Sequence, residues 1–341
     1  MKVDATVVTG SAEDFVATAV DAQERGYDAV WFAETAHDPT VGLTLAATRT
    51  GTITLGTAIT VAFARTPMTA AITANDLQEV SGGRYVLGLG TQIKPHVTKR
   101  FSMPWSRPAD RMREYVRAVR AIWATWNEGE PLRFAGEFYT HTLMTPFFSP
   151  PPNPYGPPPI HLAGVGPRMT EVAGEVADGF LAHAFTTERY LHEVTLPALR
   201  RGFEKAGRTG DGFEISGTAL IATGTTEEEF AASVRDVRRQ VAFYGSTPAY
   251  APVLELHGWG ELATELNRLS KQGDWDAMGE AVDDEVLHAI AVVAEPDDVG
   301  PALARRFGGI AQRIPLYAPA GADLDRWDHA RRYLQDTTGD R

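Results

Sequence analysis

The sequence contains no cysteine. Disulfide bonds, thiolate nucleophiles and cysteine-ligated zinc sites are therefore excluded. The histidines do not occur at the spacings typical of catalytic metal sites: there is neither an H-x-H nor an HExxH motif, and the His192-Glu193 pair lacks its second histidine. We therefore predict no metal site.

Other common signatures are also missing. The sequence has no G-x-S-x-G motif and no P-loop, which argues against the commonest hydrolases and kinases. The stretch Gly88-Leu89-Gly90 resembles the start of a dinucleotide fingerprint, but Ile93 stands where the third glycine belongs. The motif therefore indicates a Rossmann site only weakly.

Positive charge and long apolar runs are both scarce. Lys and Arg number 32 against 44 Asp and Glu, which gives a formal net charge of -12. This balance argues against a duplex nucleic-acid binder, which needs a basic face. No run approaches the ~18 apolar residues of a membrane helix, and the first residues lack the long apolar core of a signal peptide. We expect a cytoplasmic protein that binds neither nucleic acid nor membrane.

What the sequence does contain is a regular alternation of short apolar segments with helical patterns. The segments are apolar on both sides, as buried parallel strands are. About eight strand–helix pairs predict one domain, residues 1–341, with the (β/α)8 TIM-barrel fold and loop insertions. We expect strands at 3–8, 29–33, 53–59, 85–89, 160–163, 179–182, 213–222 and 313–317, and helices at 11–26, 41–50, 67–80, 107–126, 188–206, 227–243 and 324–334.

Two stretches depart from the alternation. Residues 145–159 read TPFFSPPPNPYGPPP, which is compatible with neither a helix nor an interior strand. They form either a domain linker or a long loop over a binding site, and the return of strand–helix alternation afterwards favours the loop. Residues 258–288 read as several short helices, longer than one crossover needs, so we interpret them as a helical insertion.

In a TIM barrel the site lies at the carboxyl ends of the strands. Glu34 ends the apolar strand 29–33 and would face a largely dry pocket; the alternative is a carboxylate that caps the end of the sheet. His37 follows in the loop as a candidate catalytic residue or a solvated side chain. His96 and His183 also lie at or near strand ends, and we interpret both as structural.

Aromatic side chains occur in the loops near the predicted mouth. Trp105 and the pair Phe147-Phe148 lie in such loops, and aromatics there are typical of a substrate pocket.

Residues 160–169 read IHLAGVGPRM and predict an anion site. A strand leads into two glycines, and Pro167 is placed where a helix would begin. Exposed N–H groups at a glycine-rich helix N terminus bind anions. Arg168 adds a positive charge.

Residues 53–91 carry a family resemblance. They read ITLGTAITVAFARTPMTAAITANDLQEVSGGRYVLGLGT, a strand, a helix and a second strand, which together make a βαβ unit of a parallel sheet. With residues 26–34 and 160–179, this unit resembles the luciferase-like monooxygenases and their relatives that depend on the deazaflavin coenzyme F420. The resemblance extends over nearly the whole chain.

The resemblance assigns roles to particular residues. It implies that Glu34 holds the polar edge of the ring and that His37 carries a proton, although Thr35 stands where the family has a histidine. It also implies that Gln92 replaces the glutamate of some relatives. The cofactor-binding residues that it implies are Glu34, Thr57, Ala58 and Ile59 (joined by a non-proline cis peptide bond under the ring), Thr91, and, around the cofactor phosphate, Ala163, Gly164, Val165, Gly166, Pro167, Arg168 and Met169.

The function that follows is hydride transfer between F420 and a small organic substrate. The alternatives are an FMN-dependent monooxygenase supplied by a separate reductase, a non-catalytic protein that binds flavin or deazaflavin, and, more remotely, an unrelated barrel lyase or hydrolase. Relatives of this kind form homodimers, so we expect one here. No segment of the sequence identifies the substrate.

Overall fold

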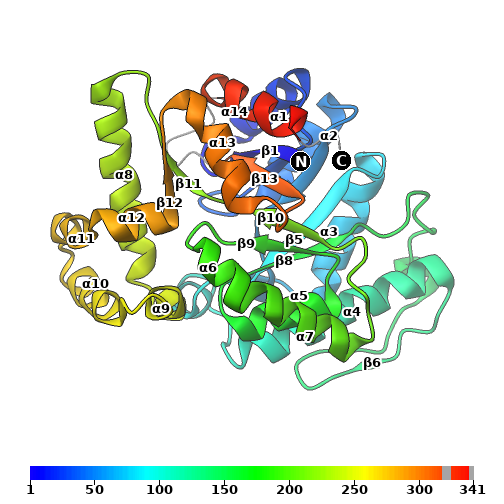
Figure 1. Cartoon of the computed structure of the whole chain (residues 1–341). Helices are drawn as coiled ribbons and strands as arrows, with labels where there is room; N and C mark the ends of the chain where they lie inside the picture. Colours follow the sequence, from blue (N-terminus) through cyan, green and yellow to red (C-terminus); the bar gives the residue numbers. More distant parts are fainter. Residues whose placement is uncertain (317–323, 338–341) are drawn as a thin grey trace.

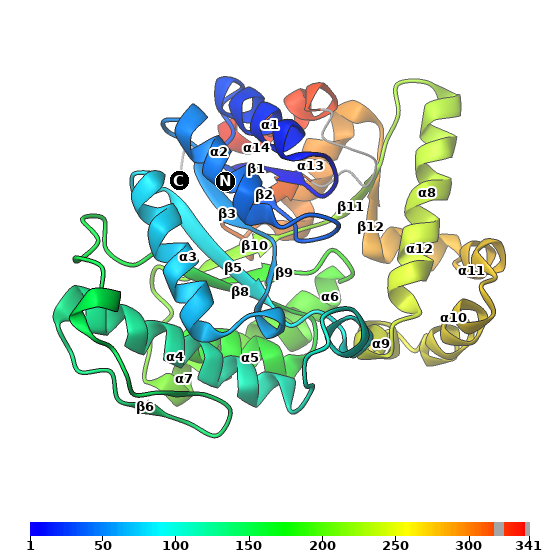
Figure 2. The ribbon, with the colours of Figure 1, turned by 180° about the vertical axis from the view of Figure 1, so that it is seen from behind.

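The computed structural model describes residues 1–316 and 324–337, which form a parallel β-barrel surrounded by helices (Figures 1 and 2). The barrel strands are β1 (Lys2–Val7), β2 (Ala29–Phe32), β3 (Thr54–Thr57) with its continuation β4 (Thr60–Val61), β5 (Tyr85–Gly90), β8 (Ile160–Gly164), β9 (Gly179–Ala182), β10 (Glu214–Gly217) and β13 (Arg313–Leu316). They are ordered β3-β2-β1-β13-β10-β9-β8-β5, and β3 also pairs with β5, which closes the barrel. The predicted (β/α)8 fold is confirmed. Tyr317, the predicted end of the last strand, lies outside the described residues.

The helices begin at signals that the sequence carries. Ser11 forms a capping box with Asp14, while Asp38 and Thr66 cap the next two helices by accepting backbone N–H groups. Several helices have proline in the first turn, where its missing N–H costs no hydrogen bond. The helical segments of the barrel are α1 (Ala12–Glu24), α2 (Pro39–Arg49), η1 (Ala62–Ala64), α3 (Pro67–Val80), η2 (His96–Arg100), α4 (Pro108–Glu128), α5 (Pro167–Val176), α6 (Glu188–Tyr190), η4 (Leu191–Thr195), α7 (Leu196–Ala206), α13 (Pro296–Phe307), η6 (Asp325–Trp327) and α14 (Asp328–Asp336).

Paired charges fill the N-terminal end of the barrel interior. Arg313 donates through Nε to Asp4 Oδ2 at 2.6 Å, through Nη2 to Asp4 Oδ1 at 3.0 Å and through Nη1 to Glu214 Oε2 at 2.8 Å. Asp4 also accepts the indole N–H of the fully buried Trp31 at 2.8 Å. Asp4 and Arg313 are both buried, and burial of such charges is tolerated because they are paired and hydrogen-bonded. This end of the barrel is therefore closed.

A helical insertion extends beyond the carboxyl end of β10. It lies between β11 (Leu220–Ala222) and β12 (Ala291–Val293), which pair in parallel. Its segments are α8 (Glu227–Gly245), η5 (Pro248–Tyr250), α9 (Ala251–Glu255), α10 (Gly260–Gln272), α11 (Trp275–Ala281) and α12 (Asp284–Ile290). They pack around a second hydrophobic core, to which Ala184, Phe185 and Tyr190 also belong. Figures 1 and 2 show the insertion to one side of the barrel.

The insertion is larger than the predicted range 258–288. That range takes in α10, α11 and most of α12. The helix expected at 227–243 as a barrel helix is instead α8, which packs against α10, α11 and α12. Barrel helices and insertion helices have the same apolar periodicity, so the pattern alone does not separate them.

The proline-rich stretch was predicted to lie over the site at the carboxyl ends of the strands, but it lies at the N-terminal end of the barrel. Residues 145–159 contain one helical turn, η3 (Pro146–Phe148), and lead directly into the start of β8. Asn153 fixes the stretch, because its Nδ2 donates to the carbonyl and the side chain of Asn75 at 3.1 Å and its N–H donates to Asn127 at 2.9 Å. Asn75 and Asn127 lie near the C-terminal ends of α3 and α4. The interpretation of this stretch as a loop over the binding site is therefore wrong.

The aromatic side chains predicted to lie near the mouth have different outcomes. Phe147 and Phe148 lie away from the mouth, whereas Trp105 lies in the segment that follows the carboxyl end of β5. Phe147 and Phe148 are 90% and 71% exposed beside the start of β8, so they do not line the mouth. Trp105 follows β5 and precedes α4, and its ring meets Phe63 edge-on at a centroid distance of 5.8 Å. A short antiparallel pair, β6 (Phe134–Ala135) and β7 (Thr140–His141), was not predicted.

Candidate active site

Glu34 lies immediately beyond the end of β2, with its side chain only 7% exposed. Its Oε2 accepts a hydrogen bond from the N–H of Val61 at 2.8 Å and from Nη1 of Arg65 at 2.7 Å. Its own N–H donates to the carbonyl of Ile59 at 3.2 Å. The carboxylate is thus fixed by the next strand and the segment after it. Within the described part of the chain, its Oε1 accepts no hydrogen bond.

Arg65 is a site residue that the sequence reasoning missed. Besides Glu34, it binds Asp38 through Nη2 at 2.7 Å, and Asp38 in turn caps α2 by accepting the N–H of Thr40 at 2.9 Å. Burial acts to lower the pKa of Arg65, but the hydrogen bonds and charges of Glu34 and Asp38 outweigh it and raise that pKa. The available signal was an arginine directly before the helix cap Thr66, close to the end of a strand that neighbours Glu34.

The peptide bond between Ala58 and Ile59 is cis, as the family resemblance implied. It separates β3 from β4. Ala58, Ile59 and the neighbouring Ala163 are partly buried over an apolar cluster in the barrel interior, which consists of Ala29, Trp31, Val86 and Leu181. These three residues form the apolar floor of the mouth.

Thr57 lies below this floor, where it joins two strands. It is 1% exposed, and its hydroxyl donates to the carbonyl of Gly88 at 2.7 Å and accepts the N–H of Gly88 at 3.0 Å. A Cβ at Gly88 would lie 1.7 Å from the carbonyl oxygen of Thr57, so only glycine fits there. The hydroxyl of Thr57 is thus engaged within the barrel wall, and the prediction that Thr57 belongs to the cofactor site stays a prediction.

Thr91 lies at the end of β5 and is half-buried. Its Oγ1 donates to the carbonyl of Gln92 at 2.9 Å, while Gln92 Oε1 accepts the N–H of Ile93 at 2.9 Å. Gln92 has φ 59°, a region that residues other than glycine rarely adopt and that often occurs at functional sites. The hydroxyl of Thr91 is therefore held by its own loop, with its oxygen still able to accept a hydrogen bond.

His37 lies exposed in the loop between β2 and α2. The backbone before it is held, because Thr35 Oγ1 donates to the carbonyl of Val8 at 2.8 Å and Arg100 donates to the carbonyl of Thr35. The structure orders this loop but does not bring His37 into hydrogen-bond contact with Glu34.

The turn between β8 and α5 has the geometry of an anion site. Gly166 is the N-cap of α5 and supplies no side-chain cap, so the first N–H groups of the helix have no intrahelical partner. A Cβ added at Gly166 would meet no atom within 4 Å, so the space in front of the turn is open. Tyr190 braces the turn by donating from its hydroxyl to the carbonyl of Val165 at 3.2 Å. Arg168 is exposed beside it.

His183 follows β9 and connects the barrel to the insertion. Its Nδ1 accepts the N–H of Phe185 at 3.0 Å, which places the proton of the neutral ring on Nε2. Burial lowers the pKa of His183 to about 4, so the ring is neutral at pH 7. The rings of Tyr244, from α8, and Tyr250, from η5, lie 4.7 and 4.8 Å away.

The model of the luciferase-like monooxygenase family matches residues 1–312. The chain belongs to the luciferase-like monooxygenase family. As a member of this family with the relatives below, it is an oxidoreductase. Among residues 1–316 and 324–337, the luciferase-like chain has no helix long and apolar enough to cross a membrane and no convergence of three side chains suited to a metal ion.

Relatives of this luciferase-like chain include both uncharacterized and named proteins. An uncharacterized protein of Mycobacterium tuberculosis is 52% identical over 319 residues, which cover 92% of this chain and 94% of the relative. The 5,10-methylenetetrahydromethanopterin reductase of Archaeoglobus fulgidus is 32% identical over 288 residues, 82% of this chain and 81% of the relative. The solved coenzyme F420-dependent tetrahydromethanopterin reductase from Methanopyrus kandleri matches with a TM-score of 0.81 at 21% identity over 98% of this chain and 99% of that chain, which shows the shared fold.

Proposed function

We propose that the protein binds the deazaflavin coenzyme F420 at the carboxyl end of the barrel and transfers a hydride between it and a small organic substrate. The names of the Archaeoglobus fulgidus and Methanopyrus kandleri reductases support this choice of reaction and cofactor. The observation that carries the proposal is the open, uncapped N terminus of α5 at Gly166, on the same rim of the barrel as the fixed carboxylate of Glu34. The N terminus of α5 suits a phosphate. The carboxylate of Glu34 keeps Oε1 available to accept a hydrogen bond from a polar ring.

A deazaflavin held at this site would supply the hydride chemistry, by which the substrate would be reduced or oxidised by two electrons. The chain positions and shields the reactants. Glu34 Oε1 would accept a hydrogen bond from the ring edge, and the floor of Ala58, Ile59 and Ala163 would support the ring and exclude water. The turn at residues 163–169 would hold the phosphate. His37, exposed at this rim, exchanges the substrate proton with solvent.

Fluorescence titrations of the cofactor-free protein with F420 and FMN, side by side, test the proposal. We expect tighter binding of F420, weaker F420 binding in Glu34→Gln, and turnover of F420 with a member of a substrate panel. Tighter binding of FMN would overturn the cofactor assignment in favour of a monooxygenase supplied by a reductase. F420 binding without turnover of any substrate would instead favour a carrier protein.

A further inference from the structure

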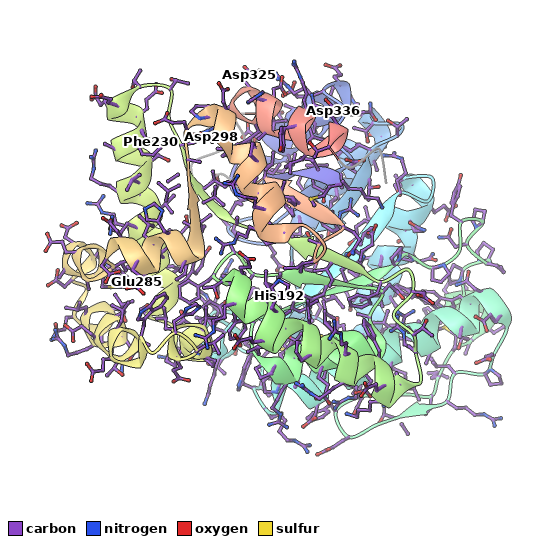
Figure 3. The ribbon with its side chains drawn as sticks, viewed as in Figure 1. His192, Phe230, Glu285, Asp298, Asp325 and Asp336 are labelled. Carbon is purple, nitrogen blue, oxygen red and sulfur yellow. The ribbon has the colours of Figure 1, made fainter. Side chains whose placement is uncertain are left out.

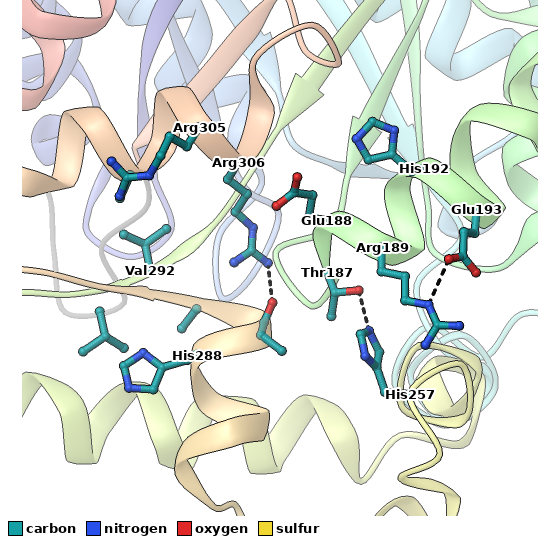
Figure 4. A pocket seen from close by; sticks show the side chains of 14 residues that line it. Thr187, Glu188, Arg189, His192, Glu193, His257, His288, Val292, Arg305 and Arg306 are labelled. Atoms are coloured by element: carbon teal, nitrogen blue, oxygen red, sulfur yellow. Dashed lines mark hydrogen bonds and ion pairs between the residues drawn. The ribbon is translucent and has the colours of Figure 1, made fainter.

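A cavity of about 710 Å³ lies on the outer flank of the molecule (Figure 4). Its walls come from the α6–η4 segment, from α12 and β12, and from α13. His192 on η4 and Glu285 on α12 mark two of these elements in Figure 3. Of the described residues that line it, none belongs to the cofactor site proposed above. This flank cavity has no role in the reaction as derived so far.

Arg306 places a buried positive charge at the wall of the flank cavity. The residue is 8% exposed, and its Nη2 donates to the carbonyls of Thr186 at 2.7 Å, Ala289 at 3.0 Å and Ile290 at 2.7 Å. Burial lowers its pKa to about 10, so it stays charged at neutral pH. No carboxylate within residues 1–316 and 324–337 forms an ion pair with it. A buried arginine is usually paired with an anion.

The guanidinium of Arg306 has a donor left for a ligand (Figure 4). Its Nε is sealed from solvent, whereas Nη1 is not sealed and donates to no residue in the described part of the chain. Three carbonyls hold the planar group in place, so Nη1 is preorganised. Arg305 also lines the cavity, is exposed, and has no ion pair with any described carboxylate. Arg189, by contrast, is paired with Glu193 at 2.9 Å.

Histidine and acidic side chains complete the lining of the cavity. His192, His257 and His288 all line the cavity, and His257 is held by Thr187 through its Nε2 at 2.8 Å. Glu188 is the acidic side chain whose charge acts on Arg306, but the two are not hydrogen-bonded. Apart from the Arg189–Glu193 ion pair, the charged lining consists of Arg305, Arg306 and Glu188, so its net charge is positive.

We propose that the flank cavity is a second binding site, specific for a ligand that bears a carboxylate or phosphate group bound by Arg306 Nη1 and Arg305. Its volume suits a ligand of metabolite size. Two sources could supply the oxyanion. One is a free carboxylate or phosphate ester. The other is the acidic tail of the cofactor, because α6 borders both sites and its Tyr190 contacts the phosphate turn at Val165. The site does not require the cofactor assignment to be correct.

Isothermal titration of the full-length protein with citrate tests the site. Citrate should bind the wild type and a matched charge-removal control, Arg133→Ala in the exposed segment before β6, which lies far from the cavity. Arg168→Ala reports any citrate that binds at the α5 turn instead. Binding should weaken at least about tenfold in Arg305→Ala and in Arg306→Lys, which keeps the charge but loses the fork. Thermal melting reports whether each variant is folded; Arg305 is exposed, so its variant decides the question if Arg306→Lys does not fold.

Three outcomes would overturn the proposal: no citrate binding, equal weakening in Arg133→Ala, or weakening in Arg168→Ala alone, which would place citrate at the α5 turn. A parallel titration of Arg305→Ala with F420 separates the two sources. A loss of F420 affinity identifies the tail as the ligand, whereas unchanged F420 affinity with weakened citrate binding identifies a free anion. A failure of F420 to bind the wild type would refute the proposed function and leave the citrate result standing.

Discussion

Replacing Gly166 by alanine tests anion binding at the α5 turn without disturbing the fold. The backbone at Gly166 has φ -74° and ψ 153°, which alanine adopts without strain, and the added methyl would meet no protein atom within 4 Å. The methyl would, however, stand in the open space before the first N–H groups of α5. It therefore obstructs a phosphate without disturbing the packing.

The substitution should affect the stability of the protein much less than its affinity for F420. Alanine is a poorer N-cap than glycine by up to about 1 kcal/mol, while the loss of glycine's freedom in the unfolded chain returns about 0.4–1 kcal/mol. The free energy of unfolding should therefore change by less than about 1 kcal/mol. Losing one hydrogen bond to a charged phosphate costs about 1.5–3 kcal/mol, so the Kd for F420 should rise about 10- to 150-fold.

The assay is a fluorescence titration with F420, paired with urea unfolding of each variant. Gly51→Ala is the matched control, because Gly51 is exposed in a loop and a Cβ there also meets nothing within 4 Å. The control should bind F420 like the wild type. A folded Gly166→Ala variant with unchanged F420 affinity would refute the assignment of the phosphate to this turn.

Three further predictions concern the supporting structure. Arg65→Ala leaves the buried carboxylate of Glu34 without its cation, so the free energy of unfolding in urea should fall by about 3 kcal/mol; an unchanged midpoint would contradict this. Gly88→Ala places a Cβ 1.7 Å from the carbonyl of Thr57, so circular dichroism should detect no native barrel, and a well-folded variant would contradict the packing. Burial lowers the pKa of His161 from 6.5 to about 4, so the unfolded chain takes up the proton first and stability should fall by up to about 3 kcal/mol as the pH drops from 6.5 to 4. His161→Gln should flatten that part of a urea-unfolding pH profile, and an identical slope in both proteins would rule out this origin.

The barrel was predictable because its parts are encoded locally. Buried parallel strands read as short apolar runs, and caps such as Ser11, Asp38 and Thr66 mark the helix starts beside them. The position of Glu34 at a strand end, and of the glycines at the start of α5, followed from the barrel rule without any contact being known.

The unpredicted features depend on contacts between distant segments. Arg65 became a site residue only when β4 was placed beside the end of β2, and the hydroxyl of Thr57 proved to join β3 to β5. The end of the barrel at which the proline-rich stretch lies could, however, have been predicted from the sequence. A segment that precedes a barrel strand enters at the N-terminal end, and residues 145–159 lead directly into β8.

The salt bridge between Asp4 and Arg313 closes the N-terminal end of the barrel, and the packed cluster of Ala29, Trp31, Val86 and Leu181 fills the interior below the mouth. A molecule bound on the floor formed by Ala58, Ile59 and Ala163 must therefore leave by the route along which it came. If the cofactor ring rests on this floor, as we propose, a substrate that stacks above it would have to bind after the cofactor and leave before it. Steady-state kinetics should accordingly follow an ordered rather than a random sequence, whichever compound proves to be the substrate.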